Sequence, residues 1–195
     1  LLIVWQSGNT ARQIAQLQSL GIPVFDSEPR TLETVATSLE RFGRLLGTEP
    51  QAQLAAARMR AQVAGLNKRY GSRPPVPVFY QAWDNPVYTL NDDQIASDAI
   101  RLCGGRNVFG ALKTIAPQVS VEAVLQLDPE VIVGGKLYTP QDRGLSIWQP
   151  YKDMTAVKRR NLFTFEEELL TRPGPRIVDG AASLCARLEE ARARR

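Results

Sequence analysis

Histidine is absent from this chain of 195 residues, and cysteine occurs only twice. Without histidine, the chain lacks the side chain that most often acts as a general base near neutral pH. The two cysteines, Cys103 and Cys185, are far apart and do not form a closely spaced metal-binding pattern. The sequence therefore predicts neither a histidine-based catalytic site nor a zinc site.

The motifs that mark common enzyme sites are also missing. The chain contains no GxSxG nucleophile elbow, no phosphate-binding loop and no GxGxxG dinucleotide fingerprint. The segment from Val133 to Lys136 contains two glycines but lacks the spacing of a phosphate loop, and we interpret it as a turn after a strand. Asp92 and Asp93 are interpreted as helix-capping residues. These absences favour a binding protein over an enzyme.

Long apolar runs are missing as well. No run approaches the roughly 18 residues that a membrane-spanning helix needs, and no secretory leader is visible. The chain opens directly on Leu1-Leu2-Ile3-Val4-Trp5, which is typical of a buried central strand. We expect that the front end of an N-terminal lobe is missing, which would also account for the absent leader.

Charge is modest and unevenly placed. The formal charge is +4, and much of the basic excess lies in Lys158–Arg160 and in the C-terminal tail. We find no motif of a nucleic-acid-binding fold and no basic face interleaved with aromatic residues. We interpret these charges as solvated surface and expect no nucleic-acid partner.

The segment from Pro117 to Gly135 combines a helix and a strand. Ser120 is a good N-cap, and apolar residues then recur at helical spacing up to Leu127. Asp128-Pro129 ends the helix, because proline disfavours helical geometry in the residue before it. Val131–Val133 then predicts a short buried strand that ends at two glycines.

The same alternation runs along the whole chain. Strands are expected over 1–5, 22–25, 76–80, 131–133 and 162–165, and helices over 10–20, 31–46, 49–70, 91–103 and from 175 onward. Strands that alternate with helices predict parallel sheets in an α/β fold. We therefore expect a remnant of an N-terminal lobe over 1–48, a helix over 49–71 and a C-terminal lobe over 72–195. The Ala-rich helix suits either a spacer between lobes or an ordinary surface helix.

Each cysteine lies on a predicted helix among apolar neighbours. Two buried free thiols are one interpretation, and a disulfide in an oxidising compartment is the other. A disulfide that closes so long a loop would stabilise the fold by about 4.5 kcal/mol in the chain-entropy model.

The sequence is similar to that of a known family. It resembles the cobalamin-binding, extracytoplasmic solute-binding proteins of ABC importers, whose two lobes are joined by one rigid helix. The segments that carry the resemblance are Leu1–Asn9, Val76–Thr89, Ile100–Phe109, Pro117–Val133 and Pro173–Leu188. The resemblance implies two Rossmann-like lobes with an incomplete N-terminal lobe, a periplasmic location and a disulfide between Cys103 and Cys185.

The resemblance also implies a set of ligand contacts. Aromatic and amide contacts would come from Trp5 and from the loop after the third strand, and polar contacts from the segment after the last strand. The residues are Trp5, Trp83, Asn85, Tyr88, Glu168 and Arg172. A carboxylate and a guanidinium suit the neutral amide side chains of a corrin, which both donate and accept hydrogen bonds. Ala116 departs from the family, which carries a large aromatic residue at this position.

Glu122 matches the carboxylate with which the family docks onto arginines of the membrane permease. From the sequence alone, Glu122 is a first-turn glutamate that interacts favourably with the helix dipole. Both roles are compatible with each other.

We therefore expect a binding protein without a resident cofactor, which captures a corrinoid such as cobalamin and delivers it to an ABC permease. Another large chelate is the alternative. A siderophore is one candidate, and haem would need an axial tyrosine such as Tyr80, Tyr88 or Tyr138 because histidine is absent. A further alternative is a truncated lobe with a structural role, which associates with another chain through exposed strand edges.

Overall fold

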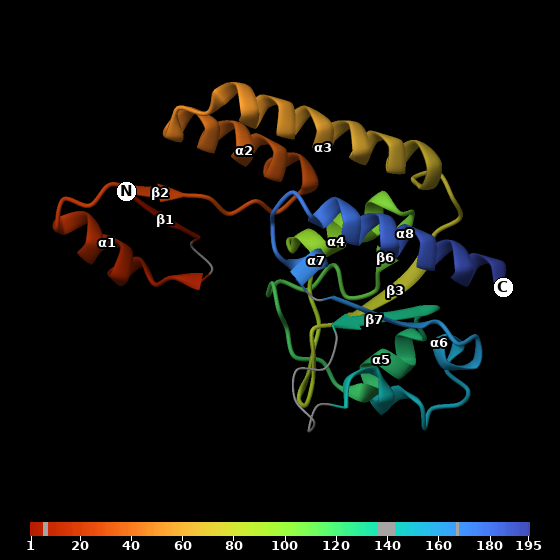
Figure 1. Cartoon of the computed structure of the whole chain (residues 1–195). Coiled ribbons are helices and arrows are strands. Elements are labelled where there is room, and N and C mark those ends of the chain that lie inside the picture. Colours follow the sequence, from red (N-terminus) through yellow and green to blue (C-terminus); the bar gives the residue numbers. More distant parts are fainter. Residues whose placement is uncertain (6–7, 136–142, 167) are drawn as a thin grey trace.

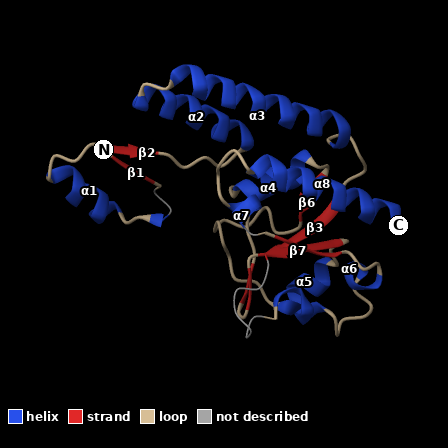
Figure 2. Ribbon diagram, viewed as in Figure 1, coloured by secondary structure: helices blue, strands red, loops and turns tan. Residues whose placement is uncertain are grey.

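A four-stranded parallel sheet forms the centre of the C-terminal part of the chain (Figures 1 and 2). The computed structural model describes residues 1–5, 8–135, 143–166 and 168–195, together with the backbone but not the side chain of Glu168. The strands lie in the order β6-β3-β7-β8. Their bounds are Val76–Gln81 for β3, Gly105–Asn107 for β6, Val131–Gly135 for β7 and Leu162–Phe165 for β8.

Helices cover both faces of this sheet. Helices α4 (Ile95–Leu102) and α8 (Ile177–Ala193) lie on one face. The other face carries α5 (Val121–Leu127), the 3-10 helix η2 (Gly144–Trp148) and α6 (Thr155–Lys158). Because side chains alternate along a strand, Val78 and Tyr80 join the core under α8, whereas Phe79 packs with Trp148 on the opposite face. The predicted α/β class with parallel strands is confirmed.

The expected helix and strand over 117–135 are present. The Ser120 hydroxyl accepts a hydrogen bond from the amide of Ala123, as an N-cap should. Asp128 ends α5 with a positive φ of 40°, and its carboxylate accepts hydrogen bonds from the amide and hydroxyl of Thr155. β7 continues through both glycines to Gly135, two residues beyond the predicted strand.

Helices α2 (Leu32–Leu46) and α3 (Glu49–Tyr70) form an antiparallel pair that lies over α4 and α8. Their apolar residues form one core cluster with Ile95, Ile177 and Val178. The carboxylate of Asp98 on α4 accepts a hydrogen bond from the amide of Leu32, at 2.8 Å. Helix α2 belongs to the segment 1–48, which the sequence predicts as a remnant of the N-terminal lobe. In the structure this helix packs on the C-terminal part of the chain.

One arginine joins α2 to α3. The guanidinium of Arg60 on α3 forms ion pairs with Glu33, at 2.8 Å, and with Glu40, at 2.5 Å. The hydrogen bonds from Arg60 hold the pKa of both carboxyl groups below the ordinary value of a glutamate. The ion pairs supplement the apolar contact between the two helices.

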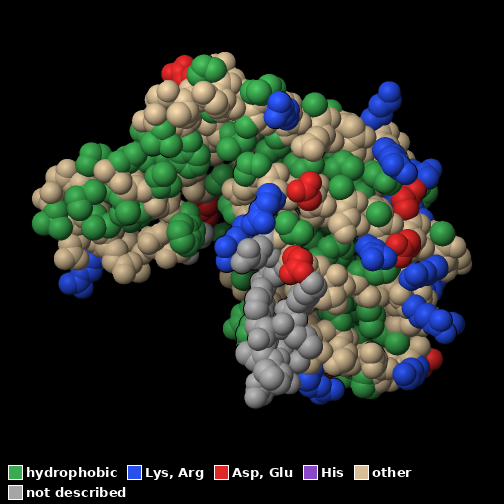
Figure 3. Space-filling view, in the orientation of Figure 1, with side chains coloured by type: hydrophobic (Ala, Val, Ile, Leu, Met, Phe, Trp, Pro, Cys, Tyr) green, Lys and Arg blue, Asp and Glu red, His purple; other side chains and the backbone are tan. Residues whose placement is uncertain are grey.

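The first 26 residues form a separate small unit. Strands β1 (Leu2–Val4) and β2 (Val24–Asp26) pair in parallel, and α1 (Ala11–Ser19) connects them. None of the residues of α1 is buried, and Leu1, Ile3 and Leu20 are exposed. Figure 3 shows the resulting concentration of hydrophobic side chains over this unit. Residues 27–31, the connecting segment, lead from β2 to α2.

Three elements differ from the prediction. The helix expected from Asn91 begins at Ile95, because the Asn91 side chain instead accepts from the amide of Asp93 in a tight turn. The sequence predicts neither strand β6, which begins at Gly105, nor the short helix α7 (Glu168–Thr171). Across the described residues, none of the helices is both long and apolar enough to cross a membrane.

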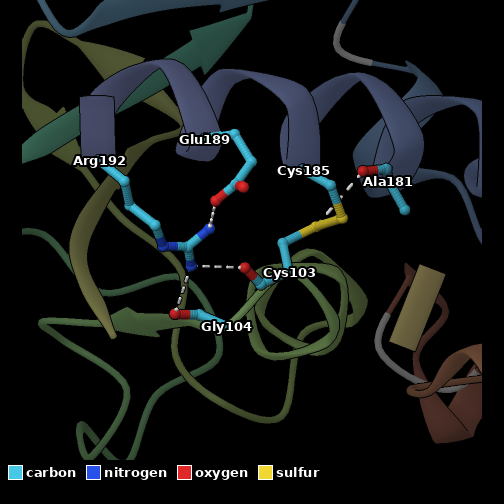
Figure 4. The surroundings of a disulfide bond; sticks show 6 residues. All are labelled: Cys103, Gly104, Ala181, Cys185, Glu189 and Arg192. Atoms are coloured by element: carbon cyan, nitrogen blue, oxygen red, sulfur yellow. Dashed lines mark hydrogen bonds and ion pairs between the residues drawn. A yellow bond between two sulfur atoms is a disulfide. The ribbon is translucent and has the colours of Figure 1, made fainter. Parts of the chain in front are cut away.

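The two cysteines form a disulfide in the core, as the resemblance implies. Cys103 ends α4, Cys185 lies on α8, and their Cα atoms are 4.7 Å apart. Arg192 reinforces the same junction, because its guanidinium donates to the carbonyl oxygens of Cys103 and Gly104 (Figure 4) and also to that of Pro74. The end of α4 is thus tied to α8 by one covalent bond and by the partly buried Arg192.

Candidate ligand-binding cavity

A cavity of about 870 Å³ lies where the N-terminal unit meets the C-terminal part. Five stretches of chain contribute to its lining: the residue after β1, the connecting segment, the start of α4, the loop at Ile115 and the segment from the end of α7 to the start of α8. Among the described residues, the lining consists of Trp5, Ser27, Glu28, Pro29, Arg30, Asp93, Gln94, Ile95, Ile115, Thr171, Arg172, Pro173, Gly174, Pro175 and Arg176. A cavity of this size is in the range that small-molecule sites occupy.

Trp5 presents its indole to this cavity directly after β1. The side chain is 55% exposed, which is unusual for a tryptophan beside a strand. The backbone around it is fixed by Asn9, whose side-chain amide donates to the carbonyl of Trp5 at 2.9 Å. Gly8 lies against the indole, so that a Cβ atom at position 8 would overlap the ring. The sequence did not single out either supporting residue, although glycine and asparagine are both common in turns.

Arg172 lines the same cavity, in the segment that follows α7. The structure thus brings together two residues that the sequence predicts as ligand contacts, Trp5 and Arg172, from positions 167 residues apart. Glu168 begins α7, but its side chain lies outside the described residues, so its predicted role stays a prediction.

The predicted aromatic loop after β3 is a hairpin of two short strands, β4 (Trp83–Asp84) and β5 (Val87–Tyr88). Trp83 and Tyr88 face each other across it, and the indole N–H of Trp83 donates to the carbonyl of Asn85. None of these residues is among the described lining of the cavity. The ligand contacts predicted for Trp83, Asn85 and Tyr88 therefore stay predictions.

Two polar residues that the sequence pattern did not single out hold this hairpin in place. The carboxylate of Asp84 accepts hydrogen bonds from the amides of Arg143, at 2.6 Å, and Gly144, at 2.8 Å. Gln81 is buried at the end of β3; it donates to the carbonyl of Gly144 and accepts from the indole N–H of Trp148. Gln81 could have been noticed in the sequence, because it is a polar residue at the end of an otherwise apolar strand.

The sheet topology explains why these segments meet at one edge. The chain leaves β3 toward β6 on one side and later returns to β7 on the other side. In open α/β sheets, ligands bind outside the carboxyl ends of the strands where the order reverses in this way. The hairpin follows β3, and α7 with Arg172 follows β8, so both lie at this edge.

The remaining predicted positions lie at the surface or in the core. Glu122 is exposed in the first turn of α5, and its role in permease docking stays a prediction. Ala116 is exposed next to Ile115, which lines the cavity. Tyr80 is 2% exposed in the core cluster under α8, whereas Tyr138 lies outside the described residues. Among the residues described, no group of three Cys, Asp or Glu side chains is arranged to hold a metal ion.

Comparison with known proteins places this architecture in one family. The family model described as periplasmic binding protein matches residues 1–169. A vitamin B12-binding protein from Vibrio cholerae is 31% identical over 97% of this chain, which spans 68% of that protein. A vitamin B12-binding protein from Photorhabdus laumondii is 34% identical, with 97% of this chain and 67% of that protein covered.

Solved structures also match this chain. The crystal structure of the periplasmic vitamin B12 binding protein of Vibrio cholerae matches with a TM-score of 0.87 at 30% identity, covering 97% of this chain and 74% of that one. A periplasmic haem-binding protein from Roseiflexus matches with a TM-score of 0.82 at 18% identity, covering 97% of this chain and 75% of that one. The second likeness concerns the fold alone.

Proposed function

The chain belongs to the periplasmic binding protein family, and on this premise we propose that it captures a corrinoid such as cobalamin outside the cytoplasm. We further propose that it delivers this ligand to the permease of an ABC importer. The relatives that are named for vitamin B12 binding align with nearly the whole chain, which supports this choice of ligand.

The observation that carries the proposal is the pairing of Trp5 and Arg172 around one cavity. The broad indole of Trp5 is open to the cavity and can pack against the flat face of a corrin. The guanidinium of Arg172 offers several donors to the carbonyl oxygens of the corrin's amide side chains. An apolar surface combined with a few polar groups is typical of small-molecule sites.

Calorimetric titration with cyanocobalamin tests the proposal. Trp5→Ala should weaken binding about 10- to 30-fold, because truncating an aromatic anchor in a binding site costs about 2 kcal/mol. Tyr151→Ala is the matched control, since Tyr151 is also an exposed aromatic residue but does not line the cavity. A folded wild-type chain that shows no cyanocobalamin binding would refute the proposal.

A different large chelate is the second candidate, and Ala116 is the observation that favours it. A small residue beside the cavity-lining Ile115 leaves space where the family carries a large aromatic side chain. The same titration with a ferrichrome-type siderophore and with haem distinguishes the candidates. Tighter binding of either probe than of cyanocobalamin would assign the cavity to that class.

Permease docking is tested separately through Glu122. Glu122→Arg should reduce ligand delivery in a reconstituted importer, because it reverses the charge offered to the permease, while cyanocobalamin affinity stays unchanged. Glu49→Arg is the matched control, because Glu49 is likewise an exposed first-turn glutamate on another helix. Equal transport by wild type and Glu122→Arg would show that the carboxylate does not dock.

A further inference from the structure

The cavity carries more positive than negative charge. Three arginines, Arg30, Arg172 and Arg176, line it together with two carboxylates, Glu28 and Asp93. The basic side chains come from two stretches of chain, the connecting segment and the residues before α8. Figure 3 shows basic side chains beside the hollow between the N-terminal unit and the rest of the chain. The net charge of these five side chains is +1, which favours an anionic group over a cationic one in the cavity.

Two of these arginines, Arg30 and Arg176, differ in whether their charge is already paired. Arg30 forms an ion pair of 3.4 Å with Glu28, so part of its charge is already balanced within the connecting segment. Within the part of the chain that the structure describes, the guanidinium of Arg176 has neither a hydrogen-bond partner nor an ion-pair partner. Arg176 is exposed and directly precedes α8, after a short segment that contains Pro173 and Pro175.

The local structure favours an anion near Arg176. Proline fixes its own φ and removes one amide donor, so the two prolines restrict the backbone that carries this arginine. The seventeen-residue helix α8 begins at Ile177, and the N-terminal end of a helix carries a partial positive charge. Asp179 in the first turn of α8 offsets part of this positive end, so the guanidinium of Arg176 is the main positive group here.

A charge of this kind is not needed for the amide side chains of a corrin, which are neutral. A complete corrinoid has one permanently anionic group, the phosphodiester of its nucleotide loop. An arginine guanidinium matches such a group in charge and geometry, because its N–H groups form paired hydrogen bonds to phosphate oxygens.

We propose that Arg176, supported by Arg30, binds the nucleotide-loop phosphodiester of the ligand and so makes the cavity selective for complete corrinoids over those without a nucleotide. This inference rests on the corrinoid function proposed above. It assigns a role to two residues that the family resemblance did not single out.

The test compares two neutral ligands that differ in this group. Cyanocobalamin contains the phosphodiester, and dicyanocobinamide lacks both phosphate and nucleotide. Arg176→Gln should weaken cyanocobalamin binding about ten-fold, which is the effect of losing one hydrogen-bonded charge contact. The same change should alter dicyanocobinamide binding less than about two-fold, and Arg30→Gln should show the same preference with a smaller effect.

Arg58→Gln is the matched control, because Arg58 is an exposed arginine on α3 that does not line the cavity. Higher salt should weaken cyanocobalamin binding more than dicyanocobinamide binding in the wild type, and Arg176→Gln should remove most of that difference. Equal weakening of both ligands by Arg176→Gln, or no weakening of either, would overturn the inference while leaving the corrinoid function intact. A wild-type chain that binds neither ligand would instead overturn the proposed function.

Discussion

Removing the disulfide between Cys103 and Cys185 should lower the free energy of unfolding by about 4.5 kcal/mol. The magnitude follows from the sequence separation of 82 residues, because the bond restricts the unfolded chain by closing a loop of that length. For a protein of this size, such a loss corresponds to a fall in Tm of roughly 9 to 18 °C. The double variant Cys103→Ala, Cys185→Ala is the direct perturbation.

Urea unfolding followed by circular dichroism measures this effect. Arg192 still ties α8 to the end of α4 in the variant, so the native spectrum should remain unchanged while the unfolding midpoint falls. Wild-type protein in reductant serves as the control for the small loss of packing that the alanines cause. Both samples should lose a similar free energy relative to oxidised wild type.

A loss below about 1 kcal/mol in both samples would refute the reasoning. It would mean that the unfolded chain remains compact enough for the bond to remove little conformational freedom. A changed native spectrum would refute it differently, because the bond would then be needed to form the native contact between α4 and α8.

Three further perturbations test the elements around the cavity. Gly8→Ala should weaken cyanocobalamin binding about ten-fold in calorimetry, because the new methyl group displaces the indole of Trp5; unchanged affinity would contradict this arrangement. Arg60→Gln should remove stability that wild type has above about pH 4.5 and loses as the pH falls through the lowered pKa values of the two α2 carboxylates, so acid unfolding curves of the two proteins should converge at low pH. Asp98→Ala should lower the free energy of unfolding in urea by about 1 kcal/mol by removing the acceptor for the amide of Leu32, and Asp98→Asn should cost less because it keeps an acceptor oxygen.

The sequence predicted those elements whose ends are set by local chemistry. Ser120 and Asp128 define α5 through contacts within or next to the helix, and Thr31 and Gly47 do the same for α2. These signals lie within a few residues of the backbone that they fix, so they are visible in the sequence.

Elements that depend on distant partners were not predictable in this way. β6 contains Gly105 and Arg106, which have no strand-like pattern, and it exists because its backbone pairs with β3. The site shows the same limit. Gly8 is only three residues from Trp5 in the sequence, but Asp84 acts on amides 59 and 60 residues away, so its role becomes visible only in the folded chain.

The placement of the three tryptophans gives the molecule a built-in optical readout. Trp148 is fully buried in the core beneath the sheet, whereas Trp5 at the cavity and Trp83 on the hairpin are open to solvent. Emission from the buried indole should report on unfolding, and emission from the exposed indole of Trp5 should respond to what enters the cavity. Because corrinoids absorb ultraviolet and visible light, a bound corrinoid would quench the indole beside it. Folding and ligand capture can therefore be followed in one unlabelled sample through different residues.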